Sequence, residues 1–84
     1  MAKARINHPG VKLAALMKEH KFSQSLVARQ AGLTQAFVSQ IISGLRGTGS
    51  ARTAIGLSKI KPFKTTALEW MTLQAQWDIH QAGE

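Results

Sequence analysis

Cysteine is absent from this sequence of 84 residues, so the chain can form no disulfide bond, no thiolate nucleophile and no cysteine-ligated zinc site. It also lacks any apolar run approaching the roughly 20 residues that a membrane-spanning helix needs, and no signal-peptide pattern opens it. We therefore expect a cytosolic protein. The length predicts a single domain, with a modest core that a partner subunit would stabilise further.

Acidic residues are scarce, with four Asp and Glu against eleven Lys and Arg, which gives a formal net charge of +7. All eleven basic residues lie in residues 1–64 with Glu19 as the one acid there, whereas residues 65–84 carry three acids and no base. A basic body favours a polyanionic partner, most simply nucleic acid; a basic surface that only meets solvent is the alternative.

The same scarcity argues against an enzyme. Four scattered acids form no carboxylate pair and no metal cluster, and no histidine stands at a readable spacing from a nucleophile. We therefore expect no catalytic residue, no metal and no cofactor. Only five aromatic residues are present, two of them in the acidic segment, so the stacking platforms of a typical RNA-binding protein are missing as well.

The central stretch, residues 23–46, has the pattern of two short helices joined by a tight turn. Ser23 and Thr34 are residue types that begin helices, and Gly32 and Gly44 are the breaks after the two apolar stretches. Two capped helices within about 24 residues, hinged at one glycine, are typical of a helix-turn-helix.

The second of these helices divides into two faces at about 100° per residue. One face is apolar, with Val38, Ile41, Ile42 and Leu45. The opposite face holds Ala36, Ser39, Gln40 and Ser43, with Thr34 and Gln35 at the N-terminal end. This outward face has no charged residue, although a solvated helix face usually carries charges. In a major groove, Gln can pair with adenine, Ser can donate or accept, and Ala can pack on a thymine methyl group.

Several residues near this helix have two interpretations each. Phe37, beside the outward face, either touches DNA or a partner or belongs to the edge of the core. Gln24, next to the Ser23 cap, can donate to a phosphate oxygen or simply meet solvent. Arg46, in a glycine-rich loop, is a candidate phosphate clamp. Residues 1–7, with Lys3 and Arg5, form an arm along DNA or a frayed terminus.

Helices are expected on both sides of the central stretch. The first begins near Pro9, and its core face holds Leu13, Leu16, Met17 and His20. Another runs from the cap Ser50 toward Pro62, with Ile55, Leu57 and Ile60 as its apolar contributors.

The last helix, residues 66–81, carries apolar residues on two opposite faces. Leu68, Met71, Ala75 and Ile79 form one stripe, and Trp70, Leu73 and Trp77 form the other. Since one core needs one stripe, the second stripe predicts cover by another chain. We assign Trp70, Leu73 and Trp77 to a dimer or partner interface. The alternative is a helix buried centrally within its own monomer.

Three segments together resemble a known family. The run from Ser23 to Gly47, with A-x-x-x-G-L-T and V-S-Q-I-x-x-G, resembles the helix-turn-helix of the phage-repressor (XRE) family. Asn7-His8-Pro9-Gly10 is similar to the opening of the HigA/VapI antitoxins. Residues 68–74 with Trp77-Asp78 resemble the close of the same group. Val11 and Leu26 stand where the family usually has an acid.

The resemblance implies a five-helix, all-α, lambda-repressor-like domain in the bacterial cytoplasm, associated with the nucleoid, that binds a palindromic operator as a homodimer. It implies that the bases are read by Gln35, Ala36, Ser39 and Gln40, and that the DNA backbone is held by Gln24, Thr34, Ser43 and Arg46. It also implies a RelE/HigB-like mRNA-cleaving toxin as partner. A stand-alone phage-type regulator without a toxin, or a module that mainly binds protein, are the alternatives.

Overall fold

The computed structural model describes residues 7–83, and the N-terminal arm of Lys3 and Arg5 lies outside that range. Five α-helices are present: α1 (Pro9–His20), α2 (Gln24–Ala31), α3 (Gln35–Ser43), α4 (Ala51–Ser58) and α5 (Ala67–Gln81). A 3-10 helix, η1 (Lys61–Phe63), lies between α4 and α5. The predicted five-helix, all-α fold is confirmed. Among the helices of residues 7–83, none combines the length and apolar character that a bilayer crossing requires.

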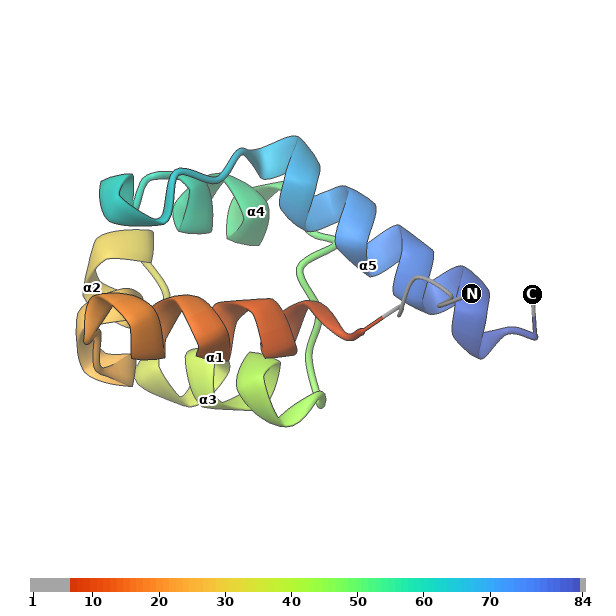
Figure 1. The fold of residues 1–84 in the computed structure, drawn as a ribbon, viewed down its shortest axis with the longest axis horizontal. Helices are drawn as coiled ribbons and strands as arrows, with labels where there is room; N and C mark the ends of the chain where they lie inside the picture. The colour runs from red at the N-terminus through yellow and green to blue at the C-terminus, as the bar shows by residue number, and fades with distance from the viewer. Residues whose placement is uncertain (1–6, 84) are drawn as a thin grey trace.

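The first helix is the centre of the arrangement. In Figure 1, α1 runs across the middle with α3 beside it on one side, and α4 and the start of α5 on the other. It contacts α3, α5 and η1, while α2 contacts both α3 and α4. The final helix continues past the ends of its neighbours, so its C-terminal half projects from the body (Figure 1).

The core collects the apolar faces of all five helices around α1. Its members are Leu13, Met17, Val27, Ala28, Ala31, Val38, Ile41, Ala54, Leu57, Ile60, Phe63 and Trp70. Close packing of such side chains is the main source of stability in a domain of this size. Leu16 and Phe37 are half-buried against this cluster, so both touch the core as edge residues.

Two residues expected in the core are exposed instead. Leu45 is 77% exposed because α3 ends at Ser43 and Gly44 turns the chain with a φ of 88°. Ile55 is exposed because the buried face of α4 is formed by Thr53, Ala54, Gly56 and Leu57. A Cβ atom on Gly56 would lie 2.2 Å from the carbonyl oxygen of Ala31, so glycine lets α4 lie directly against the end of α2.

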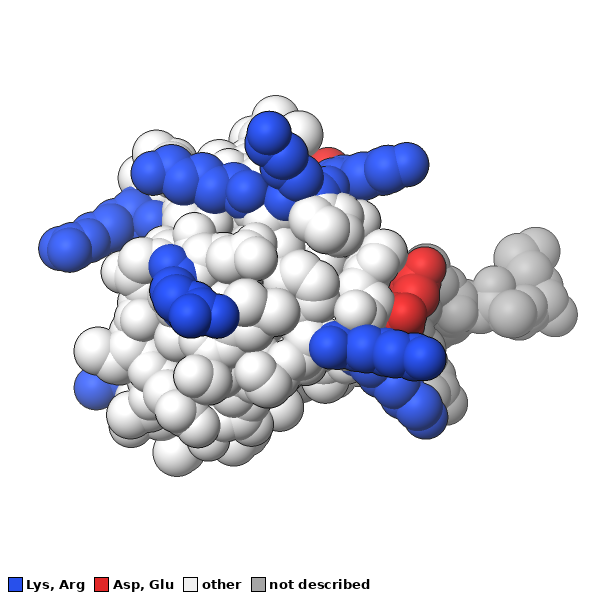
Figure 2. All heavy atoms as spheres, turned by 90° about the vertical axis from the view of Figure 1, so that its left-hand side faces the viewer, with Lys and Arg blue, Asp and Glu red and all other residues white. Residues whose placement is uncertain are grey.

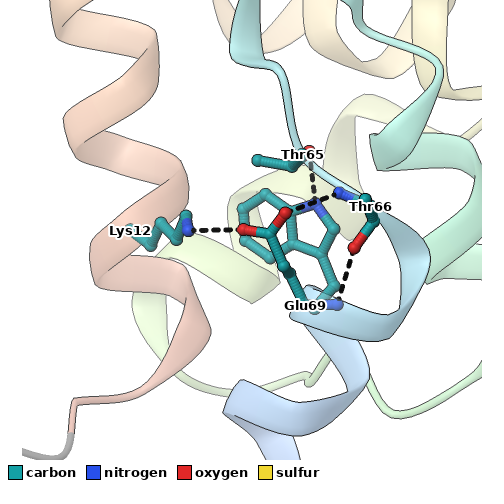
Figure 3. Close-up of polar contacts among 5 residues, drawn as sticks. Lys12, Thr65, Thr66 and Glu69 are labelled. Carbon is teal, nitrogen blue, oxygen red and sulfur yellow. Dashed lines mark hydrogen bonds and ion pairs between the residues drawn. The ribbon is translucent and has the colours of Figure 1, made fainter.

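The start of α5 is fixed by a capping box. The Thr66 hydroxyl accepts from the Glu69 N–H at 3.1 Å, and the Glu69 carboxylate accepts from the Thr66 N–H at 3.1 Å. Figure 3 shows the Lys12 ammonium reaching from α1 to the same carboxylate, at 3.4 Å. The Lys12 hydrogen bond, followed by the one from the Thr66 backbone, holds the pKa of Glu69 below its ordinary value.

Candidate DNA-binding surface

The outward face of α3 is held in place by its buried face. Val38 and Ile41 are fully buried, and Gln35, Ala36, Ser39 and Ser43 are exposed, as predicted, whereas Gln40 is half-buried at the edge of the outward face and Leu45 lies outside the helix. Residues 35–43 carry no charged side chain. The outward face therefore offers amide, hydroxyl and methyl groups without a formal charge.

The three residues His8-Pro9-Gly10 seat α1 against α3. The Nδ1 atom of His8 accepts from the Gly10 N–H at 3.0 Å and so caps α1, while Pro9 occupies the first turn. A Cβ atom on Gly10 would lie 2.0 Å from the carbonyl oxygen of Ile41, which belongs to α3. Glycine at this position therefore allows the backbones of α1 and α3 to touch, and it fixes how far α3 stands out from the body.

The turn between α2 and α3 follows the predicted pattern. Ser23 caps α2 by accepting from the Leu26 N–H at 3.1 Å, and Thr34 caps α3 by accepting from the Phe37 N–H at 3.0 Å. Gly32 adopts the left-handed conformation, with a φ of 72°, that ends α2. Because the Thr34 hydroxyl accepts here, its hydrogen remains free to donate to a phosphate oxygen. Gln24, in the first turn of α2, is half-buried.

The C-terminal end of α3 brings three predicted residues together. The Arg46 Nε–H donates to the side-chain oxygen of Gln40 at 3.1 Å. The Ser43 hydroxyl donates to the backbone carbonyl oxygen of Gln40 at 3.1 Å. Ser43 therefore has to rotate its hydroxyl before it can donate to a phosphate oxygen, whereas Arg46 already lies next to the outward face.

Positive charge lies beside this face rather than on it. In Figure 2, Lys and Arg side chains project mainly from the upper part of the surface, at the height of α4 in Figure 1, and from its flanks, whereas much of the lower part, at the height of α3, is uncharged. Arg46 is hydrogen-bonded to Gln40 near the C-terminal end of α3, and Arg52 lines a shallow pocket with Gly32 and Thr34 near its N-terminal end, so two cations suited to phosphates lie next to a neutral helix suited to base edges. Sequence-specific DNA-binding proteins typically combine cationic contacts to phosphates with neutral hydrogen-bonding contacts to base edges.

The interface assignment needs a correction at Trp70, whose side chain is 0% exposed. Its Nε1–H donates to the buried Thr65 hydroxyl at 2.8 Å, in the setting shown in Figure 3, so its side chain cannot lie at a contact with another chain. Leu73 is half-buried against the core. Trp77 is half-buried too, and its ring packs edge-on against His8 at 5.6 Å. The alternative of burial within the monomer is right for Trp70.

The opposite stripe of α5 is mostly uncovered: Leu68 is 75% exposed, Ile79 is 52% exposed and Ala75 is exposed as well, whereas Met71 is half-buried against the core. Thr72, next to this stripe, is also exposed. The stripe with Leu68 and Ile79 is exposed, and not the stripe with Trp70, because the capping box and the Thr65 hydrogen bond orient α5 with Trp70 inward. A helical pattern identifies both stripes, but it cannot determine which one faces the rest of the chain.

One structural contact beside the site does not follow from the sequence pattern alone. Thr48 is fully buried, its hydroxyl donates to the Trp70 carbonyl oxygen at 2.7 Å, and its N–H donates to the Gln74 side chain at 2.9 Å. These bonds tie the loop that carries Arg46 to α5. The signal was available in the two glycines that flank Thr48. A Cβ atom on Gly47 would lie 2.2 Å from the Gln74 oxygen, so the loop backbone approaches α5 closely.

No family model matches the chain, but individual proteins do. Virulence-associated protein A' of Dichelobacter nodosus is 36% identical over 78 residues, which is 92% of this chain and 65% of that protein. The chain thus spans just under two thirds of the length of this curated relative.

Solved structures match over more of their length. The antitoxin HigA of Pseudomonas aeruginosa, solved with the higBA promoter, has a TM-score of 0.81 and 33% identity, covering 93% of this chain and 83% of that one. Antitoxin GraA has a TM-score of 0.82 and 33% identity, over 95% and 84%. A Pseudomonas aeruginosa protein in complex with its 28-bp operator DNA has a TM-score of 0.82 and 32% identity, over 94% and 85%.

Proposed function

Because this chain belongs to the HigA-type family of helix-turn-helix antitoxins, we propose that it is an operator-binding transcriptional repressor and not an enzyme. The observation that carries the proposal is the outward face of α3. That face is neutral, largely exposed and rich in hydrogen-bonding groups, and Arg46 and Arg52 lie near its two ends. Two of the solved relatives that share this fold are bound to a promoter and to operator DNA. A repressor acts on the chromosome, so its place is the cytoplasm, at the nucleoid.

In this proposal Gln35, Ala36, Ser39 and Gln40 read base edges in the major groove. The DNA backbone is held by Gln24, Thr34, Ser43 and Arg46. Arg46 can meet a phosphate as a charged donor, while Gln24 and Thr34 lie at the N-terminal ends of α2 and α3, where helix dipoles favour an anion. The α3 face supplies the hydrogen bonds that distinguish one base pair from another.

The experiment compares two duplexes at one salt concentration: the DNA upstream of the chain's own reading frame, and a shuffled duplex of the same composition. Fluorescence anisotropy should show the upstream DNA bound at least about a thousandfold more tightly. Equal affinities at every salt concentration would leave only nonspecific electrostatic binding, and the repressor function would be wrong.

We also propose that the chain works as a homodimer through α5, which suits a palindromic operator. Support comes from the exposed stripe of Leu68, Thr72, Ala75 and Ile79, whose spacing of three and four residues forms one continuous helix face. Covering it with the same face of a second copy buries apolar area on both helices at once. Leu73 and Trp77 then flank this contact, and Trp70 supports it from within.

A toxin partner is the final part of the proposal. Family membership supports a RelE/HigB-like mRNA-cleaving toxin, which the chain would bind and restrain while repressing the operon they share. Co-expression with the adjacent reading frame tests this: a small basic protein should co-purify with the chain and lose its RNA-cleaving activity in the complex. If operator binding is present and no such protein co-purifies, the chain is a stand-alone phage-type regulator. A co-purifying partner without operator binding would instead make it a protein-binding module.

A further inference from the structure

Arg46 contacts Gln40 at two points, one on its backbone and one on its side chain. The Arg46 backbone N–H donates to the Gln40 carbonyl oxygen at 3.1 Å, and the Arg46 Nε–H donates to the Gln40 Oε1 atom at 3.1 Å. The chain reverses there because Gly44 is left-handed, and the N–H of Leu45 also donates to the Gln40 carbonyl oxygen at 2.9 Å. The loop geometry therefore carries the guanidinium back to the last turn of α3.

This attachment determines which end of the Gln40 amide faces outward. A guanidinium group has donors and no acceptor, so the amide atom that meets Arg46 has to be the oxygen. The NH2 group then points away from Arg46. An unrestrained glutamine presents its oxygen or its NH2 group with nearly equal ease, because the two ends of the amide have almost the same shape.

We propose that Arg46 is a positioning residue that sets the base preference of Gln40 by fixing this amide orientation; the inference rests on the proposed operator binding. With its NH2 group outward, Gln40 donates to the acceptors of the major groove: purine N7, guanine O6 or thymine O4. Cytosine presents the N4 amino group there, which is itself a donor. Cytosine is therefore disfavoured at the base that Gln40 faces.

Loss of Arg46 removes this restraint and a positive charge together, so the two effects have to be separated. Charge loss weakens binding to all sequences alike. Loss of the restraint changes the preference at one base position only. Arg52 provides the matched control, because it is an exposed arginine on α4 that lines a shallow pocket with Gly32 and Thr34, beside the turn of the motif. Arg52→Met removes the same charge and the same planar group without touching Gln40.

The test is selection of bound duplexes from a random double-stranded DNA pool, followed by sequencing, for the wild type and three variants. The wild type should disfavour cytosine about fivefold or more at one position of each half-site. Gln40→Glu identifies that position, because its carboxylate still accepts from Arg46 but offers an acceptor outward; cytosine should become favoured there.

Arg46→Met should lose the discrimination against cytosine at that position and keep the preferences at all the others. Arg52→Met should keep every preference of the wild type. An Arg46→Met variant that retains the full wild-type preference would overturn the positioning role and leave operator binding intact. If the wild type enriches no sequence at all, both the operator-binding function and this inference fail.

Discussion

A single residue, Gly10, controls the contact between α1 and α3, the helix proposed to read DNA. It lies in the first turn of α1, where its missing side chain lets the backbone meet the Ile41 carbonyl group. The obstacle to a larger residue is a backbone atom, which cannot rotate away as the end of a side chain can. The position therefore demands glycine for steric reasons, and its effect reaches α3 directly.

We expect Gly10→Ala to destabilise the fold by about 1–3 kcal/mol, since the added Cβ atom forces the two helices apart. Chemical denaturation measures this loss. Gly49→Ala is the control, because the nearest atom to its added Cβ is the flexible Gln74 Cγ at 3.3 Å, and its cost should stay within about 0.5 kcal/mol. Equal stabilities of the two variants would mean that the close approach at Ile41 is unimportant.

The residues that begin and end helices were predictable from the sequence, because their roles depend on local chemistry. The caps Ser23 and Thr34 and the helix-ending Gly44 follow from side-chain chemistry and backbone freedom within a few residues, and the structure has them in those roles. The burial of Trp70 and Thr48 was not predictable in the same way. Whether a tryptophan on α5 faces inward depends on contacts with residues elsewhere in the chain.

At the scale of one element, α5 shows how local and long-range interactions combine. Its capping box is local, whereas the ion pair between Lys12 and Glu69 joins it to α1, and the Lys12 ammonium also lies 5.8 Å from the centre of the Trp70 ring. Glu69 takes part in both the capping box and the ion pair with Lys12, whereas Thr66 takes part only in the capping box. Substitutions at these two residues can therefore separate the two interactions.

Thr66→Ala removes the cap and should lower the free energy of unfolding by about 1 kcal/mol, measured by urea denaturation. Glu69→Gln keeps a side chain that can complete the capping box but loses the charge that pairs with Lys12. The Glu69→Gln variant should therefore be less destabilised than Thr66→Ala. The reverse order would show that the ion pair, rather than the cap, holds the start of α5.

The same pair of proteins, wild type and Glu69→Gln, gives a pH dependence. The pKa of Glu69 is lowered in the folded state, so its carboxylate stabilises the fold above the ordinary pKa of glutamate, and this stabilisation disappears as the pH falls through the folded value. The difference in Tm between the two proteins should therefore stay constant above the ordinary pKa of glutamate and shrink as the pH falls below it. A difference that stays constant below that pKa as well would mean that the charge of Glu69 contributes nothing.

The loop after α3 was predicted only as a loop, and its packing explains why more was not predictable. Thr48 and Gln74 are 26 positions apart, and their hydrogen bond forms only when α5 lies against the loop. The glycines beside Thr48 indicated a turn, but not the element that approaches it. This attachment connects the loop that carries Arg46 with the helix proposed for dimerisation.

At the scale of the whole molecule, charge and apolar surface are segregated. The basic body holds the helix-turn-helix, and the acidic segment forms α5, whose exposed stripe runs from Leu68 to Ile79. The segregation was predictable from composition and order along the chain. The side of α5 left uncovered was not, because the helical period alone treats both stripes equally.

The proposed dimer predicts that Ile79→Lys shifts the chain from a dimer to a monomer, since a charge would be buried in an apolar contact between two copies. Light scattering after size-exclusion chromatography measures the mass. Gln81→Lys adds the same charge on the other side of α5 and should leave the dimer intact. A wild-type protein that is monomeric at every protein concentration measured would show that the proposed dimer is wrong.

The central claim is that the neutral face of α3 reads base edges while nearby cations such as Arg46 hold phosphates. The most direct measurement is the affinity of Gln40→Ala for the operator duplex and for a shuffled duplex, compared with the wild type at the same salt concentration. Operator affinity should fall by about 1–3 kcal/mol, and affinity for shuffled DNA should hardly change. Equal losses on both duplexes would contradict the claim, because Gln40 would then act on the DNA backbone and not on the bases.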